Sequence, residues 1–243
     1  MKLHEIKLGK SMSIIGVFCA AVAGGLIADQ LVDTGPVVCL VDPTCRTLTK
    51  NEQEMLRPVF GNALPYGDIR VFKRPPIHKV FSEDHIGSAF FNNVYLTKEA
   101  GPQQDDFGLS VNPDSKEDVI GDDIFVHEIS HVWQNQQRRS PIILDELDYY
   151  YEIKPDSVFS DFNREQQAEI IRTYFVLRRE ILRDQEKLNL PEHSPTTQGL
   201  AKALVPKCQR FLEHQRLLEK ILPLEPVNTC RVPATERLSH PDL

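Results

Sequence analysis

The pentapeptide His127-Glu128-Ile129-Ser130-His131 constrains this chain more than any other feature. Residues four apart lie on the same face of an α-helix, so the side chains of His127 and His131 can bind one metal ion. Glu128 lies beside them, where its carboxylate can take a proton from a water held by that metal. The motif therefore predicts a zinc site, and a surface helix with two solvated histidines is the alternative. That alternative is disfavoured because hydrophobic neighbours indicate burial. These neighbours are Phe125, Val126, Ile129, Val132 and Trp133.

A helix is predicted over residues 124–139, which contain neither proline nor glycine. Asp122 and Asp123 directly precede this run and offer side-chain oxygens as N-caps. The polar, acidic residues 101–121 are predicted to form a loop that leads into the helix. The hydrophobic surface of the helix would be buried, which leaves the histidine pair facing a cleft.

Catalytic zinc commonly takes three protein ligands and keeps one position for water, so a third ligand is needed. The next histidine, His193, lies in a proline-rich segment. A second helix is predicted from Asn163, which is a suitable N-cap and is followed by hydrophobic residues at helical spacing. Glu165 and Glu169 lie one turn apart on this helix, so Glu165 can bind the metal while Glu169 accepts a hydrogen bond from a liganding histidine. Spacing alone leaves a solvated glutamate pair as the alternative.

Residues 127–134 and 165–170 together resemble a group of bacterial zincin-like proteins, often labelled Vgr-related or Rhs-associated because of links to type VI secretion loci. In that group a HExxHVWQ helix is followed by an EQQAEI helix. The general pattern is similar to that of gluzincin metallopeptidases, in which a glutamate on a downstream helix completes the site. The resemblance covers roughly residues 46–185. It implies that Glu165 is the third zinc ligand and that Glu169 is its partner one turn later.

Two tyrosines between the motif helices, Tyr149 and Tyr151, are candidate catalytic residues. A tyrosine near a zinc site can donate its hydroxyl to the oxyanion of a tetrahedral intermediate. The similar proteins tend to carry a Tyr-x-Tyr pattern here, which these two residues match. Packing is the more common use of a tyrosine cluster and is the alternative.

The expected fold class is α+β: a zincin-like metallopeptidase domain with a small sheet, the active-site helix and C-terminal helices. Thr49 caps a predicted helix that Gly61 ends. A hairpin turn is placed on Asn92-Asn93, which tolerate positive φ. By analogy with zincin-like folds, the hairpin near Val94-Tyr95 is expected to bind an extended substrate through main-chain hydrogen bonds. The predicted elements are a helix over residues 48–60, a strand over 69–72, a hairpin of 88–91 with 94–96, and a last helix over 199–222 that follows a break at 189–198.

The N-terminus has the layout of an export signal. Lysines dominate residues 1–10, and the uncharged residues 11–28 follow. Residues 1–29 are therefore predicted to be a signal peptide, or a membrane anchor in which residues 11–28 form the tether. A buried core helix is the alternative. Either export interpretation places the rest of the chain in the periplasm or cell envelope.

Beyond Cys19, which lies in the predicted leader, the chain has four cysteines. They agree with export, because an even number suits a disulfide framework in an oxidising compartment. Pairing of Cys39 with Cys45 and of Cys208 with Cys230 is the preferred connectivity, although four cysteines permit two other pairings. A thiolate zinc site is disfavoured, since no Cys-x-x-Cys spacing is present. Four free buried cysteines are the remaining alternative.

Composition bounds the class of protein. The chain has 243 residues, of which 41% are hydrophobic and 26% charged, enough for one catalytic domain with a hydrophobic core. A formal net charge of −7 provides no basic field for nucleic acid. The expected organisation is a leader over residues 1–29, a linker over 30–46, the zincin-like domain over 47–223, and an extended tail over 224–243.

These features predict an exported, zinc-dependent metallopeptidase that acts on peptide, protein or peptidoglycan bonds. Zinc would be held by His127, His131 and Glu165, and Glu128 would activate the attacking water and pass its proton to the leaving amine. The alternative from another class is a secretion-system accessory or binding protein with a structural or catalytically silent metal site.

Overall fold

The computed structural model describes residue 39 and residues 42–73, 87–97, 105–107, 116–137, 148–188 and 195–230. The predicted leader, including residues 11–28, and residues 231–243 lie outside this part of the chain. The helices are α3 (Lys50–Phe60), α5 (Lys116–Gln137), α6 (Arg164–Leu188) and α7 (Pro195–Leu218). The strands are β1 (Arg46–Thr47), β2 (Arg70–Lys73), β3 (Gly87–Phe90) and β4 (Asn93–Leu96), and two 3-10 turns are η3 (Phe159–Asp161) and η4 (Asn228–Cys230).

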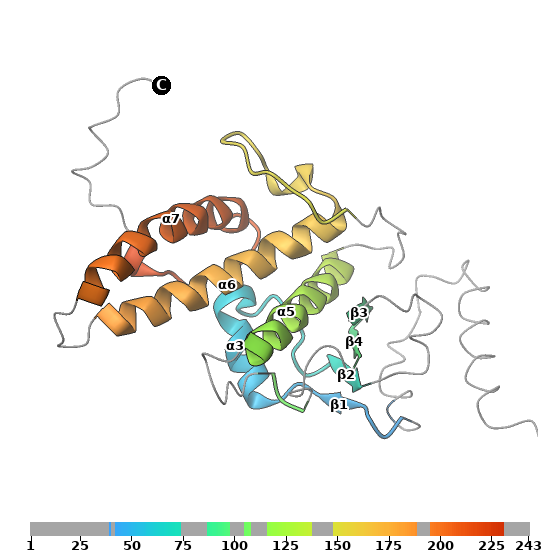
Figure 1. Ribbon diagram of the computed structural model, residues 1–243. Helices are drawn as coiled ribbons and strands as arrows, with labels where there is room; N and C mark the ends of the chain where they lie inside the picture. Colours follow the sequence, from blue (N-terminus) through green and yellow to red (C-terminus); the bar gives the residue numbers. More distant parts are fainter. Residues whose placement is uncertain are drawn as a thin grey trace, which may run out of the picture.

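The four strands form one sheet in the order β1-β2-β4-β3, in which β2 and β4 run parallel and the other pairs run antiparallel. Helix α5 lies between this sheet and α6, and α7 lies alongside α6 on the far side (Figure 1). The structure is therefore a mixed helix and sheet arrangement. The buried core joins all these layers and includes Leu56, Phe60, Val71, Val94, Phe125, Ile129, Ile170, Tyr174 and Phe211.

The capping signals of α3 and α6 have the predicted effect. Thr49 accepts a hydrogen bond from the amide of Glu52, whose carboxylate accepts one from the amide of Thr49. Asn163 and Gln166 make the same reciprocal pair at the start of α6. Both helices thus begin where a side chain satisfies main-chain donors that have no partner within the helix. Gly61 ends α3 with a φ of +50°, which glycine adopts without strain.

The start of α5 differs from the prediction. The helix begins at Lys116, within the predicted loop, so Asp122 and Asp123 lie inside it and do not cap it. Both aspartates are buried and face Arg179 of α6, at 3.2 Å and 2.9 Å respectively. A cation from a distant helix therefore stabilises two carboxylates that the local sequence presents as caps.

The hairpin turn and its strands also differ from the prediction. The turn falls on Phe91 and Asn92, with a φ of +52° at Phe91, and Asn93 is already the buried first residue of β4. The amide group of Asn135 on α5 donates to the main-chain oxygen of Phe91 at 3.1 Å, which holds the turn against the helix. Strand β4 pairs with β2 on one side and β3 on the other, so its main chain is used within the sheet. Within the described sheet the edge strand of this hairpin is β3, so the substrate-binding role predicted for the hairpin near Val94-Tyr95 would fall to β3 and stays a prediction.

Two disulfide bonds join cysteines of the described residues. Cys39 is bonded to Cys45, and Cys208 of α7 is bonded to Cys230, which confirms the preferred connectivity. Helix α7 begins four residues before the predicted start and ends at Leu218. Residues 224–230, predicted as part of an extended tail, instead include η4 and are attached to α7 by the second disulfide. Among the described residues, no helix has the length and apolar character needed to cross a membrane.

Candidate metal centre

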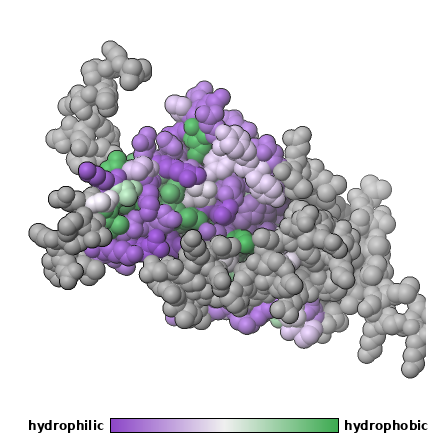
Figure 2. All heavy atoms as spheres, viewed as in Figure 1, coloured by the Kyte–Doolittle hydropathy of each residue, from purple (hydrophilic) through white to green (hydrophobic). Residues whose placement is uncertain are grey.

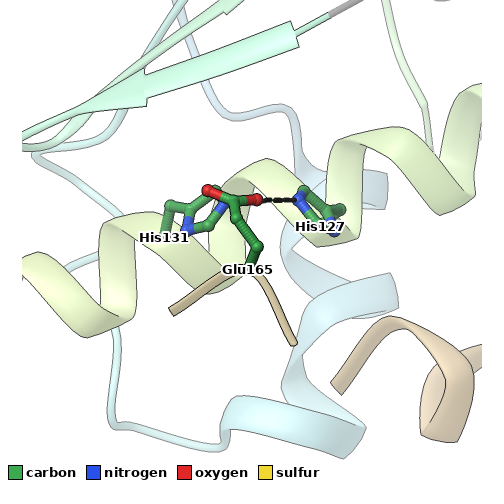
Figure 3. Close-up of side chains that lie close together, drawn as sticks. All are labelled: His127, His131 and Glu165. Atoms are coloured by element: carbon green, nitrogen blue, oxygen red, sulfur yellow. Dashed lines mark hydrogen bonds and ion pairs between the residues drawn. The ribbon is translucent and has the colours of Figure 1, made fainter. Parts of the chain in front are cut away.

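Three side chains from α5 and α6 converge on one point. His127 and His131 lie one turn apart on α5, and Glu165 reaches them from the first turn of α6 (Figure 3). The Nε2 atoms of the two histidines lie 3.1 Å apart, and Oε2 of Glu165 lies 3.3 Å from Nε2 of His127 and 3.1 Å from Nε2 of His131. The structure thus brings together the three predicted metal ligands.

This triangle of donor atoms has the size of a tetrahedral zinc site. Ligands about 2.0–2.1 Å from zinc at tetrahedral angles lie about 3.3 Å from one another. The three observed separations, from 3.1 to 3.3 Å, are close to that value. Two nitrogen lone pairs and a carboxylate oxygen this close together repel one another unless they share a cation or a proton. Geometry and donor chemistry therefore both suit a small divalent ion.

The orientation of His131 is set by Gln134, a residue whose role was not predicted. Its Oε1 lies 2.8 Å from Nδ1 of His131, and its Nε2 donates to the main-chain oxygen of Arg164 at 2.9 Å and to Gln167 at 3.1 Å. Since the amide nitrogen of Gln134 is used as a donor, its oxygen must accept, so Nδ1 of His131 carries the proton. The lone pair of Nε2 then points to the centre, as a metal ligand requires. The sequence offered one signal for this role, because residues three positions apart on a helix, such as His131 and Gln134, are neighbours on its surface.

His127 has a similar partner in Glu169, whose Oε2 lies 3.5 Å from Nδ1 of the imidazole. Glu169 also forms an ion pair with Arg172 at 2.7 Å, which holds its carboxylate in place. This is the position predicted for a residue that orients a liganding histidine. Glu165 and Glu169 thus lie on opposite nitrogens of the same ring, and only Glu165 faces the centre.

The electrostatic field at this point favours positive charge. Burial alone would lower the pKa of His127, but the carboxylates of Glu165 and Glu169 outweigh it and raise the pKa to about 9. Burial likewise raises the pKa of Glu165, yet hydrogen bonds from His127 and His131 hold it well below its usual range. Perturbed groups of this kind, partly buried beside one another, are typical of functional sites.

Glu128 lies next to this centre. Its side chain is buried, at 6% exposure, and its charge acts on both His127 and Tyr149. Helix α5 thus presents the predicted base on the face that borders β3.

The two predicted catalytic tyrosines occupy different places. The ring of Tyr149 lies beside His127, with 6.0 Å between ring centroids. Burial and the negative charges of the nearby glutamates raise the pKa of Tyr149 to about 12, so its hydroxyl keeps its proton at neutral pH. The hydroxyl of Tyr151 instead lies 2.9 Å from both Thr173 on α6 and His214 on α7. Of the two predicted tyrosines, Tyr149 is therefore the one that borders the predicted metal ligands.

A groove of about 480 Å³ adjoins the centre. Its lining includes Tyr149 and Glu169, which lie beside His127, and extends along α6 and α7 to Tyr151, Arg210 and His214. The face of the molecule seen in Figure 2 is mostly hydrophilic where residues are described, with small separate hydrophobic areas. Tyrosine rings and polar or charged side chains make up most of the lining of the groove.

Comparison with known proteins gives one partial similarity. The chain is 26% identical over 147 residues to the type VI secretion system spike protein VgrG2b of Pseudomonas aeruginosa. The match covers 56% of this chain and only 13% of that protein. No family model matches the chain, and no solved structure gives a significant match. The similarity supports a Vgr-related association for this chain.

Proposed function

We propose that this protein is a zinc-dependent hydrolase of peptide bonds. The observation that carries the proposal is the convergence of three donor atoms from His127, His131 and Glu165, with mutual separations of 3.1–3.3 Å. Three protein ligands are the number that catalytic zinc sites use, while structural sites take four. Among the described residues, no other group of histidine, cysteine or acidic side chains has such a geometry.

Zinc held by these residues would lower the pKa of a coordinated water toward 7 and polarise a scissile carbonyl. Glu128 accepts the proton of the attacking water on its carboxylate and delivers it to the nitrogen of the leaving amine. Tyr149 keeps its phenolic proton and donates a hydrogen bond to the oxygen that becomes negative during attack. Glu169 and Gln134 hold the two imidazoles through their Nδ1 atoms.

The substrate would lie in the groove beside the centre. The groove is lined by tyrosine rings and by charged and amide side chains, which suit a polar peptide or a peptide of the cell wall. The two disulfides and the similarity to a secretion-system protein indicate an exported protein. A peptide or peptidoglycan substrate in the periplasm or cell envelope agrees with both features.

The similarity to a spike protein also favours a second candidate function. An accessory domain of a type VI secretion system would need no turnover, and the metal would then support the structure only. The two candidates differ in one outcome: a hydrolase cleaves peptides or muropeptides, whereas an accessory domain binds zinc without cleaving any of them.

Metal analysis of the purified protein together with three variants tests the proposal. The wild type should contain one zinc ion per chain, and Glu165→Ala should lose it. Glu186→Ala changes an exposed glutamate of the same helix and should retain it. Glu128→Gln should keep zinc but lose cleavage of a library of peptides and muropeptides. Full zinc in Glu165→Ala, or unchanged turnover in Glu128→Gln, would contradict the proposed site.

A further inference from the structure

We propose that Gly87 is a positioning residue for Glu128, because the space left by its missing side chain is the space that the Glu128 carboxylate occupies. This inference rests on the proposed function, since it concerns the residue assigned as the base. Gly87 is the first residue of β3, and the side chain of Glu128 lies directly against it.

The contact is too close for any other residue at position 87. A Cβ atom built on Gly87 would lie 2.6 Å from Oε1, 2.8 Å from Cγ and 2.9 Å from Cδ of Glu128. Non-bonded carbon atoms are at their optimum at about 3.5–4.0 Å, so all three contacts are strongly repulsive. The collision involves most of the Glu128 side chain and cannot be relieved by turning the carboxylate about its last bond alone.

Neither main chain can easily retreat from this contact. Strand β3 is paired with β4 along its length, from Gly87 opposite Leu96 to Phe90 opposite Asn93. The turn that follows is bonded to Asn135 on α5. Helix α5 is itself packed against α6, which supplies Glu165. The strand and the helix therefore have a set separation, and it leaves room for a carboxylate but not for an added methyl group.

The cheapest response to a side chain at position 87 is a rotation of Glu128 away from β3. Such a rotation leaves the fold and the three metal ligands in place but moves the proton acceptor away from the attacking water. A general base must lie within hydrogen-bond reach of the proton that it takes, so a displacement of this size impairs the chemical step more than substrate binding.

The test compares Gly87→Ala with Gly67→Ala, a glycine at which an added Cβ meets no atom within 4 Å. Gly87→Ala should retain one zinc ion per chain and lower kcat at least tenfold, with KM within about threefold of the wild type. Gly67→Ala should leave zinc content, kcat and KM unchanged. An unchanged kcat in Gly87→Ala overturns the inference.

A second measurement does not depend on activity. Thermal unfolding of a double-mutant cycle compares Gly87→Ala in the wild type and in Glu128→Ala, where the colliding atoms are absent. Gly87→Ala should lower Tm in the wild type and leave it unchanged or raised in Glu128→Ala. Equal shifts of Tm in the two backgrounds overturn the inference. If the wild type cleaves no substrate, the proposed function fails, whereas this cycle still decides whether Gly87 confines Glu128.

Discussion

Replacement of Gln134 by alanine tests whether the residues around the ligands, as well as the ligands themselves, determine zinc affinity. Gln134 is 2% exposed and makes three hydrogen bonds, to Nδ1 of His131, to the main-chain oxygen of Arg164 and to Gln167. In Gln134→Ala the imidazole of His131 loses the acceptor that selects its tautomer and ring orientation. The contact between α5 and α6 also loses the hydrogen bonds from Gln134 to Arg164 and Gln167.

The two effects have different magnitudes and can be measured separately. Loss of a partner that orients a metal-bound histidine weakens metal affinity by roughly 10–100-fold, which is about 1.4–2.7 kcal/mol of binding free energy. Three buried hydrogen bonds at about 1 kcal/mol each place the loss in the free energy of unfolding, without zinc, at roughly 3 kcal/mol. Gln134→Glu separates them, because a carboxylate still accepts from Nδ1 of His131 but cannot donate to Arg164.

Zinc affinity is measured by competition with a chelator, and stability by urea unfolding in the presence of EDTA. Gln136→Ala is the matched control, since Gln136 is exposed and lies two residues further along α5. We expect Gln134→Ala to lose both affinity and stability, Gln134→Glu to lose mainly stability, and Gln136→Ala to lose neither. The reasoning is refuted if a folded Gln134→Ala binds zinc as tightly as Gln136→Ala. Equal affinity losses in Gln134→Ala and Gln134→Glu would assign the effect to helix packing and not to the orientation of His131.

Three further predictions concern stability. Burial lowers the pKa of His214 from 6.5 to about 4, so the unfolded chain binds more protons than the folded chain between pH 6.5 and 4. The free energy of unfolding, measured with EDTA, should therefore fall by up to about 3 kcal/mol as the pH drops through this window. His214→Gln should remove this part of the pH dependence in urea titrations. Replacing Cys208 and Cys230 by serine opens a loop with a sequence separation of 22 and should cost about 3 kcal/mol in the same assay, whereas an unchanged urea midpoint would contradict this. Glu52 is fully buried and forms a bidentate pair with Arg46 at 2.6 and 2.8 Å, so Glu52→Gln should lower the unfolding free energy by about 3–5 kcal/mol; a loss below 1 kcal/mol would show that the pair contributes little.

Sequence signals that act within a few residues predicted the structure well. The capping pairs at Thr49 and Asn163 are completed by residues three positions later, so both partners are visible in one short segment. The start of α5 was misplaced for the opposite reason. Asp122 and Asp123 have the chemistry of caps, and the charge that lets them lie buried inside a helix belongs to Arg179, more than 50 residues away. No local pattern indicates that pairing.

The same distinction applies to the candidate site. His127, Glu128 and His131 follow from one helical turn, whereas the choice between Glu165 and Glu169 depends on how α6 is placed against α5. Spacing left that choice open, and only the resemblance to zincin-like proteins favoured Glu165. The contact between Gly87 and Glu128 could not be predicted either, because it depends on the separation of a strand and a helix that are distant in sequence.

Two polar links set the register of α6 along α5. Arg164 donates to Oδ1 of Asn135 at 2.7 Å near one end of the crossing, and Arg179 pairs with Asp122 and Asp123 near the other. The residues linked on α6 are 15 positions apart, or about 22 Å along a helix with a rise of 1.5 Å per residue. Their partners on α5 run in the reverse order, so the two helices are antiparallel with one register.

This register decides which glutamate faces the candidate metal site. A slide of α6 by one turn, about 5.4 Å, would bring Glu169 to the position that Glu165 now occupies relative to His127. Such a slide would break both links at once and leave the buried carboxylates of Asp122 and Asp123 without Arg179, which costs several kcal/mol. The hydrogen bond between Arg164 and Asn135 and the ion pairs of Arg179 therefore favour the register in which Glu165 faces the candidate metal site.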